Sequence, residues 1–203
     1  MSLPILLGSS SGYRRSLLEK LQLPFIWTAP SIDETPLTNE PPAALALRLA
    51  KSKAQSLASS FPNYLIIGSD QTCTCKGKIY GKPYTPEQAF LQLRAFSGER
   101  VIFYTGLCLY NSQTHTSQEI CETYTLEFRN LDNEDIREYI RREEPLDCAG
   151  SIKTEGLGIT LIKAFIGEDP NSLVGLPLIK LIDMLKNEGY NPLTPRQPSS
   201  SGK

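Results

Sequence analysis

An apolar run that ends in a glycine and a carboxylate constrains the fold most strongly. The run from Tyr64 to Ile67 is followed by Gly68, Ser69 and Asp70. It lacks the polar alternation of a half-solvated strand, so it predicts a strand covered on both faces, as in the middle of an α/β sheet. Gly68 would let a ligand or a second backbone approach closely. Since ligands of such sheets collect at strand carboxyl ends, we expect Asp70 in a functional site; the alternative is a simple Asx turn.

The charge balance excludes several classes of partner. The 203-residue chain has 21 Lys and Arg against 22 Asp and Glu, so it lacks the basic excess that neutralises a nucleic-acid backbone or an acidic membrane surface. No apolar stretch approaches the roughly 20 residues of a membrane helix, and the first residues do not resemble a signal peptide. We expect a cytoplasmic protein without nucleic-acid or membrane partners. A single domain is predicted over residues 1–193, with a disordered Pro/Ser-rich tail at 194–203.

Histidine and cysteine chemistry is disfavoured. Five scattered cysteines are an odd number in a chain too large to need disulfide staples, so reduced thiols are expected. Cys73 and Cys75 lie two residues apart, but no second Cys or His pair completes a zinc site. The single histidine, His115, falls in a polar segment typical of a hairpin tip. Acid–base chemistry must then come from carboxylates, and charge stabilisation from Lys and Arg.

A hydroxyl-rich loop follows the first apolar run of the chain. Ser9, Ser10 and Ser11 separate a strand predicted at 4–7 from a helix whose first turn contains Arg14. Small polar residues at a helix start present backbone N–H groups and the positive end of the helix dipole to an anion. The guanidinium adds a fork of donors. The alternative is that Ser11 only caps the helix while the arginine is solvated.

A lysine interrupts the apolar face of the next predicted helix, at 43–59. Ala50, Lys53 and Leu57 share that face, so Lys53 either snorkels to solvent or points into a groove. Lys51 fits the same description, and spacing alone does not choose between the two.

The remaining patterns alternate between strand and helix, as in α/β proteins. Thr85 and Pro86 have the residue types of an N-cap and a first helical position. The expected strands are 24–27, 101–110, 121–128 and 159–162, and the expected helices are 85–98, 131–142 and 178–189.

Short motifs are spread over the chain in a fixed order: Ser9–Arg15, Asp33–Thr35, Lys53, Gly68–Gln71, Gly81–Pro83, Cys148–Ser151, Glu155–Gly156 and Val174–Pro177. Taken in this order, they resemble the Maf nucleoside triphosphate pyrophosphatases. The similarity extends from about Pro4 to Leu193, and several motifs in the right order are far more specific than any one. Within that family the chain resembles the 7-methyl-GTP pyrophosphatase branch.

The resemblance implies a fold and a reaction. The fold is α/β, a mixed twisted sheet flanked by helices, with two lobes and a central cleft, often as a homodimer. The reaction is hydrolysis of the α–β phosphoanhydride of a nucleoside triphosphate with a divalent cation, Mg²⁺ or Mn²⁺. The resemblance makes Asp70 the proton acceptor and, with Glu34, a metal ligand. It also selects Lys53 over Lys51. The triphosphate is assigned to polar and basic side chains: Ser9, Ser11, Arg14, Lys53 and Lys82.

Three positions bear on the choice of base. The pyrimidine-specific branch has arginine, threonine and glutamine where this chain has Tyr13, Gln71 and Glu155. Because a methylated guanine is electron-poor and offers N–H donors, an aromatic face and an accepting carboxylate suit it. The expected substrate is 7-methyl-GTP. The alternatives are dTTP or UTP hydrolysis, or a non-catalytic nucleotide-binding regulator of cell division, although a pure binder has no need of a water-orienting acid.

Overall fold

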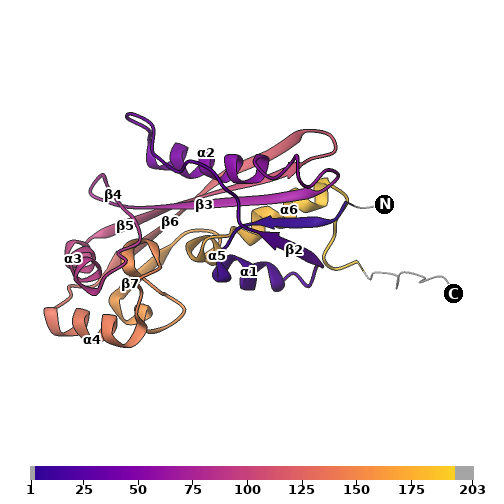
Figure 1. Ribbon diagram of the computed structural model, residues 1–203. Helices are drawn as coiled ribbons and strands as arrows, with labels where there is room; N and C mark the ends of the chain where they lie inside the picture. The colour runs from indigo at the N-terminus through magenta and orange to yellow at the C-terminus, as the bar shows by residue number, and fades with distance from the viewer. Residues whose placement is uncertain (1–2, 195–203) are drawn as a thin grey trace.

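The computed structural model describes residues 3–194, and within that range seven strands form one mixed sheet with helices on both faces (Figure 1). The strand order is β2-β1-β3-β5-β6-β7, and β4 pairs with β3. The predicted α/β class is confirmed.

The strands are β1 Ile5–Gly8, β2 Phe25–Thr28, β3 Leu65–Cys75, β4 Lys78–Tyr80, β5 Arg100–Asn111, β6 Thr116–Phe128 and β7 Ile162–Ile166. The helices are α1 Gly12–Glu19, α2 Pro42–Gln55, α3 Pro86–Phe96, α4 Asn133–Glu143, α5 Pro170–Val174 and α6 Leu178–Asn187, with short 3₁₀ turns at Ala149–Ser151 and Leu157–Leu161.

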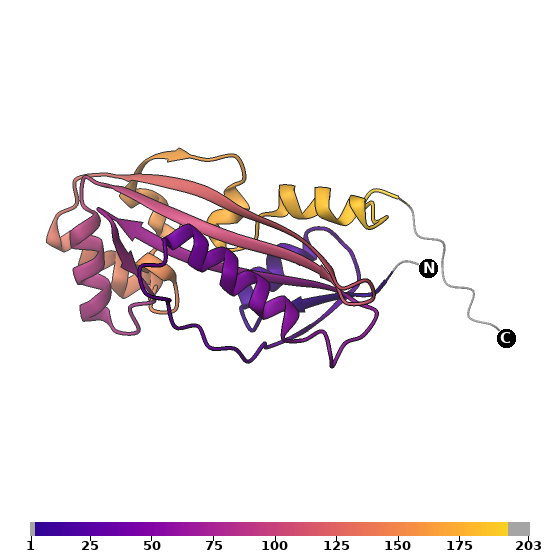
Figure 2. The same cartoon turned by 90° about the horizontal axis from the view of Figure 1, so that it is seen from above.

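The central strands are buried on both faces because their alternate side chains meet different helices. Leu6 and Ile66 pack with Ala50 of α2 on one face. Leu7 and Ile67 point to the other face and pack in a cluster with α1 and α6. Figures 1 and 2 show α2 lying across one side of the sheet, with α1 on the other. The uninterrupted apolar run thus forms the predicted doubly covered strand.

Two glycines bring α2 very close to the sheet. A Cβ at Gly68 of β3 would lie 2.1 Å from the carbonyl oxygen of Ala50, and one at Gly106 of β5 would lie 2.2 Å from that of Ala46. Both oxygens belong to the backbone of α2. The sequence predicted that a ligand or a second backbone would approach Gly68, and the structure shows the backbone of α2 there. This contact sets the height of α2, and therefore of Lys53, above β3.

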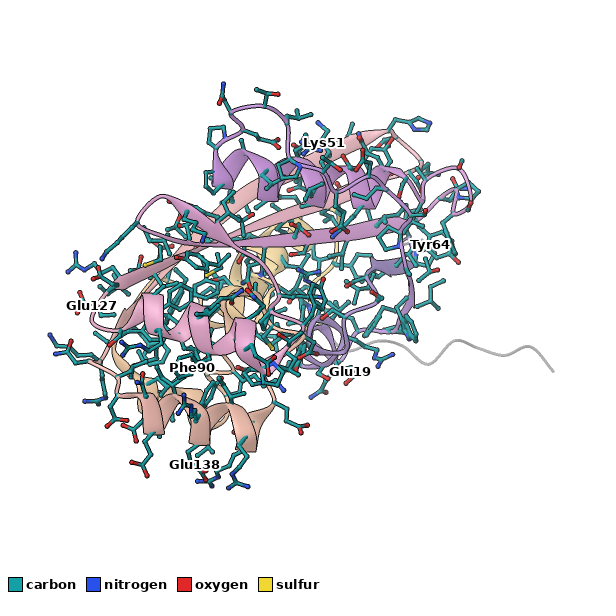
Figure 3. All side chains as sticks on the ribbon, turned by 60° about the vertical axis from the view of Figure 1, so that its left-hand side comes forward. Glu19, Lys51, Tyr64, Phe90, Glu127 and Glu138 are labelled. Carbon is teal, nitrogen blue, oxygen red and sulfur yellow. The ribbon has the colours of Figure 1, made fainter. Side chains whose placement is uncertain are left out.

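A separate apolar cluster covers the far end of the sheet, where α3 and α4 pack against each other and against β3, β5 and β6. The guanidinium of Arg137 on α4 stacks 5.0 Å from the ring centre of Phe90 on α3. In Figure 3 Phe90 lies on the α4 side of α3, while Glu138 projects from α4 on the side away from α3. The predicted division into two lobes stays a prediction.

The strand predicted at 159–162 is wrong. Residues Leu157–Leu161 form a 3₁₀ turn, and β7 begins only at Ile162, which pairs with Phe128. Gly158 donates its N–H to the carbonyl of Lys153, so the chain coils back on itself before it can extend. Leu157 and Leu161 pack in the apolar cluster that includes α4, whereas Ile159 is 50% exposed.

Other sequence-based expectations fall into three groups. All five cysteines are free thiols, and His115 lies exposed in the hairpin turn between β5 and β6, as predicted. Among residues 3–194, none of the helices has the length and apolar character needed to cross a bilayer. From residue 195 onward, the predicted tail lies outside the described residues.

Candidate active site

One edge of β3 is left open over a short stretch. On this edge β1 pairs with residues Leu65 to Gly68 and β4 with Cys73 to Cys75, while β5 pairs with the whole of the other edge. Within the described chain no strand covers Ser69 to Thr72 on the open edge. Asp70 therefore does not follow a strand end, as the sequence suggested. It lies inside an 11-residue strand, at the position where the neighbouring strand stops.

Two loops converge on this gap. The parallel strand β1 ends at Gly8 beside Gly68, and the antiparallel strand β4 ends at Tyr80 beside Cys73. The loops that follow, at Ser9–Ser11 and Gly81–Pro83, both start where β3 is uncovered. They border a cleft of about 550 Å³, a size typical of small-molecule sites. Every candidate residue taken from the sequence lines it: Ser9, Ser11, Tyr13, Arg14, Glu34, Lys53, Asp70, Gln71, Lys82 and Glu155.

A lysine between two carboxylates lies in the cleft. The Nζ atom of Lys53 is 2.6 Å from Oδ1 of Asp70 and 2.8 Å from Oε1 of Glu34. The side chains of Lys53 and Asp70 are only 10% and 13% exposed, whereas that of Glu34 is 59% exposed. Lys51, labelled on α2 in Figure 3, instead pairs with Glu119 at 2.9 Å. The structure thus brings Lys53, and not Lys51, to the cleft.

The hydroxyl loop holds the start of α1. The hydroxyl oxygen of Ser11 accepts the N–H of Arg14 at 3.4 Å, and that of Ser9 accepts the N–H of Ser11 at 3.1 Å. The capping alternative is therefore confirmed for Ser11. Capping does not use the hydroxyl hydrogens, so both serines can still donate to an anion.

Arg14 is fixed by a carbonyl from the other end of the chain. Its Nε donates to the carbonyl oxygen of Gly175 at 2.8 Å, and the buried hydroxyl of Ser69 donates to the same oxygen at 2.8 Å. Burial lowers the pKa of Arg14, and the carboxylates of Asp70 and Glu34 oppose that shift. Gly175 ends α5 with φ +112, a left-handed conformation suited to glycine. A fixed guanidinium therefore lies within electrostatic range of both carboxylates.

The amide hydrogens of Gln71 are already used by the protein. Its Nε2 donates to Thr105 Oγ1 at 3.0 Å and to the carbonyls of Ser172 and Leu173 at 2.8 and 3.0 Å. These bonds tie α5 to β3. They also determine which end of the side-chain amide is the NH₂ group, because the two backbone carbonyl oxygens can accept a hydrogen bond but cannot donate one. Toward a ligand in the cleft, Gln71 has only its own carbonyl oxygen to offer, which is an acceptor.

The other part of the cleft is acidic and partly aromatic. The thiol of Cys148 lies 3.9 Å from the hydroxyl of Tyr13. Burial raises the pKa of Tyr13, and Cys148, Asp147 and Glu155 raise it further, so both carboxylates lie within electrostatic range of the ring. Sequence reasoning included Tyr13 and Glu155 but missed Asp147, whose position depends on a loop that no local pattern predicts.

Glu143 holds the loop that carries Glu155. Its carboxylate accepts the N–H of Leu157 at 2.7 Å, and a Cβ at Gly156 would lie 2.5 Å from the same oxygen, Oε1. The Nζ atom of Lys153 also donates to the backbone carbonyl oxygen of Glu143, at 2.9 Å. Glycine at position 156 thus leaves room for the α4 carboxylate, and a larger residue there would displace the end of the Glu143 side chain.

The thiols are expected to react slowly in the native state. Burial raises the pKa of Cys148 and of Cys108 to about 12 and that of Cys121 to about 11, and it raises the pKa of Cys73 and Cys75 as well. Because the thiolate is the reactive form, iodoacetamide at about pH 8 should label native protein much more slowly than urea-unfolded protein. Peptide mapping by mass spectrometry measures this rate. Rapid native labelling of Cys148 would contradict the environment described for it.

Fold and site together define a class of protein: an α/β protein whose cleft combines a helix N-terminus, a half-buried arginine and a carboxylate–lysine cluster, which suits a phosphorylated ligand. The family model described as Maf-like protein matches residues 4–188, and the chain belongs to that family. Membership indicates nucleotide pyrophosphatase activity in general. The family resemblance noted from the sequence is confirmed, whereas the 7-methyl-GTP branch stays a prediction.

Proposed function

We propose that this protein hydrolyses the α–β phosphoanhydride of 7-methyl-GTP to give 7-methyl-GMP and pyrophosphate. The observation that carries the proposal is the carboxylate of Asp70, held 2.6 Å from the Lys53 ammonium in a cleft. The lining of that cleft includes basic groups, a helix N-terminus, Tyr13 and acidic groups. This set of groups suits a ligand with an anionic tail and an electron-poor base.

The triphosphate is assigned to the basic part of the cleft. The N–H groups at the start of α1 and the guanidinium of Arg14 supply donors that are already in place. Lys82 enters from the loop after β4, and within the described chain no salt bridge engages its ammonium. Its charge is free to neutralise phosphate oxygens. Lys53 adds a second ammonium close to Asp70.

The carboxylates fit a divalent cation that binds together with the substrate. Within residues 3–194, no group of three or more His, Cys, Asp or Glu could hold a metal on its own. Mg²⁺ commonly takes one or two carboxylates plus waters and substrate phosphates, and Asp70 and Glu34 meet at a single ammonium. These two would hold Mg²⁺ or Mn²⁺. When bound, the cation neutralises charge on the polyphosphate and polarises the phosphorus–oxygen bond.

Asp70 is assigned the role of general base. An ionised carboxylate can accept the proton of a water that attacks the α-phosphorus, as the bond to the bridging oxygen breaks and pyrophosphate leaves. Lys53 holds the carboxylate in one orientation through its 2.6 Å contact with Asp70. Arg14 and Lys82 stabilise negative charge on the transferring and leaving groups.

The base is assigned to Tyr13, Gln71 and Glu155. 7-Methylguanine carries a delocalised positive charge and offers N–H donors, whereas Gln71 and Glu155 can both act as acceptors toward it. The ring of Tyr13 supplies an aromatic face for a cationic base. Uracil and thymine lack the charge and offer fewer donors, so they would gain less from this environment.

The test is a pyrophosphate-release assay with Mg²⁺ across 7-methyl-GTP, GTP, dTTP and UTP. The highest kcat/KM is expected for 7-methyl-GTP. A preference for dTTP or UTP would favour the pyrimidine alternative. Binding of all four nucleotides without turnover would favour a nucleotide-binding regulator and overturn the proposal.

The acidic contact to the base has its own expected result. Glu155→Gln should lower kcat/KM for 7-methyl-GTP by about tenfold or more, because the negative charge is lost and one acceptor oxygen becomes an NH₂ donor. It should leave any slow turnover of dTTP unchanged. Steady-state kinetics with both nucleotides measures the ratio. An equal loss for both would mean that Glu155 acts on folding or on the phosphates instead.

A further inference from the structure

An exposed tyrosine with an unusual backbone lies beside the cleft. Tyr84 closes the loop Gly81-Lys82-Pro83-Tyr84 between β4 and α3, and its side chain lines the cleft. Tyr84 is 75% exposed, whereas Pro83 before it is buried. Pro83 therefore packs this loop against the protein, whereas Tyr84, beside the cleft, is mostly exposed to solvent.

The backbone of Tyr84 is in the left-handed region, with φ +60. This conformation is uncommon for a bulky residue and costs free energy that packing usually has to offset. Here the exposed ring recovers little by packing. A strained aromatic residue beside a cleft is the kind of outlier from which a functional role can be inferred.

Two backbone hydrogen bonds hold this loop against the acidic part of the cleft. The N–H of Tyr84 donates to the carbonyl of Leu146 at 3.1 Å, and the N–H of Gly150 donates to the carbonyl of Gly81 at 3.2 Å. The segment between these contacts carries Asp147 and Cys148, which contact or influence Tyr13. Tyr84 thus borders the part of the cleft that contains Tyr13.

We infer that Tyr84 is a base-binding residue whose ring stacks on the purine of the bound nucleotide. The inference rests on the proposed function, since it takes the ligand to be a purine nucleotide with its phosphates near Lys82. Aromatic rings stack on any nucleobase, and a base that carries positive charge adds a cation–π attraction. Lys82 and Tyr84 lie two residues apart, so one short loop would contact both the phosphates and the base.

The experiment compares Tyr84→Gly and Tyr84→Phe with wild type. Isothermal titration calorimetry with 7-methyl-GMP measures base binding without turnover. Tyr84→Gly should weaken binding by about tenfold or more, as loss of one base–aromatic stack does, and Tyr84→Phe should stay within about twofold because the ring is kept. Calorimetry with inorganic pyrophosphate, which has no base, should give the same affinity in all three proteins.

Folding effects are separated by the direction of the stability change. Glycine adopts a positive φ without strain, so Tyr84→Gly should raise Tm by about 2–4 °C, because the strain of the left-handed conformation is relieved. A variant that is more stable yet binds the nucleotide more weakly cannot be explained by misfolding. Leu91→Ala, which shortens an exposed side chain on α3 outside the cleft, should change neither measurement by much.

The outcomes distinguish the inference from the proposed function. Unchanged affinity of Tyr84→Gly for 7-methyl-GMP would overturn the role of Tyr84, even in an enzyme that releases pyrophosphate normally. Weakened affinity in a protein that turns over no nucleotide would support the role and reject only the proposed activity. If wild type does not bind 7-methyl-GMP at all, both are rejected.

Discussion

Substitution of Asp70 by asparagine is expected to lower the rate of pyrophosphate release by about 10²- to 10⁴-fold, the usual contribution of a general base. Asparagine has nearly the same shape, so the cleft should keep its form. It cannot accept a proton from water, and it removes one of the two carboxylates that meet at Lys53. The affinity for nucleotide should change by no more than about threefold, because Arg14 and Lys82 remain.

Single-turnover kinetics with 7-methyl-GTP measures the chemical step, and calorimetry measures binding. Asp183→Asn, which neutralises an exposed carboxylate on α6 outside the cleft, is the matched control and should retain full activity. Asp70→Asn with activity close to wild type would reject Asp70 as the base. Loss of binding together with activity would place Asp70 among the groups that hold the substrate.

The sheet core was predictable because its residues obey local rules. The run from Tyr64 to Ile67 has no polar alternation, and the structure buries its strand on both faces. Thr85 and Pro86 start α3 as their residue types indicate. These patterns depend only on residues that are neighbours in sequence, so they can be recognised without knowledge of the fold.

The continuity of β3 through Ser69 and Asp70 was not predictable in the same way. Ser69, Asp70 and Gln71 resemble a strand end, yet β5 pairs with all of them. On that edge they pair with a strand more than thirty residues away in sequence, and this pairing overrides the local turn preference of Asp and Ser. The open edge that makes the cleft results from where β1 and β4 stop, and this depends on pairing that local sequence does not specify.

The site residues were predictable where a family motif included them, and less so where only the fold brings them together. Spacing alone could not separate Lys53 from Lys51, because both fit the same helical pattern. The packing of α2 on the sheet separates them: Lys53 meets Asp70 while Lys51 meets Glu119. Tyr84 lay within no motif, and its only signal is a positive φ, which sequence does not reveal.

Gly68→Ala is expected to destabilise the protein by about 3 kcal/mol or more. The added methyl would lie 2.1 Å from the backbone oxygen of Ala50 and 2.9 Å from the backbone nitrogen of Ala54. Neither atom can rotate away as a side-chain end would, so α2 must move from the sheet. Because Lys53 is on α2, its 2.6 Å contact with Asp70 should also be lost, and activity should fall even where the variant is still folded.

Urea unfolding monitored by circular dichroism measures the stability change, and Gly81→Ala is the matched control. A Cβ at Gly81 would meet nothing within 4 Å, so that variant should unfold within about 0.5 kcal/mol of wild type. If Gly68→Ala unfolded at the same urea concentration as Gly81→Ala, α2 could not lie as close to β3 as described. Since the position of Lys53 depends on that contact, the same result would also remove the structural basis for its pairing with Asp70.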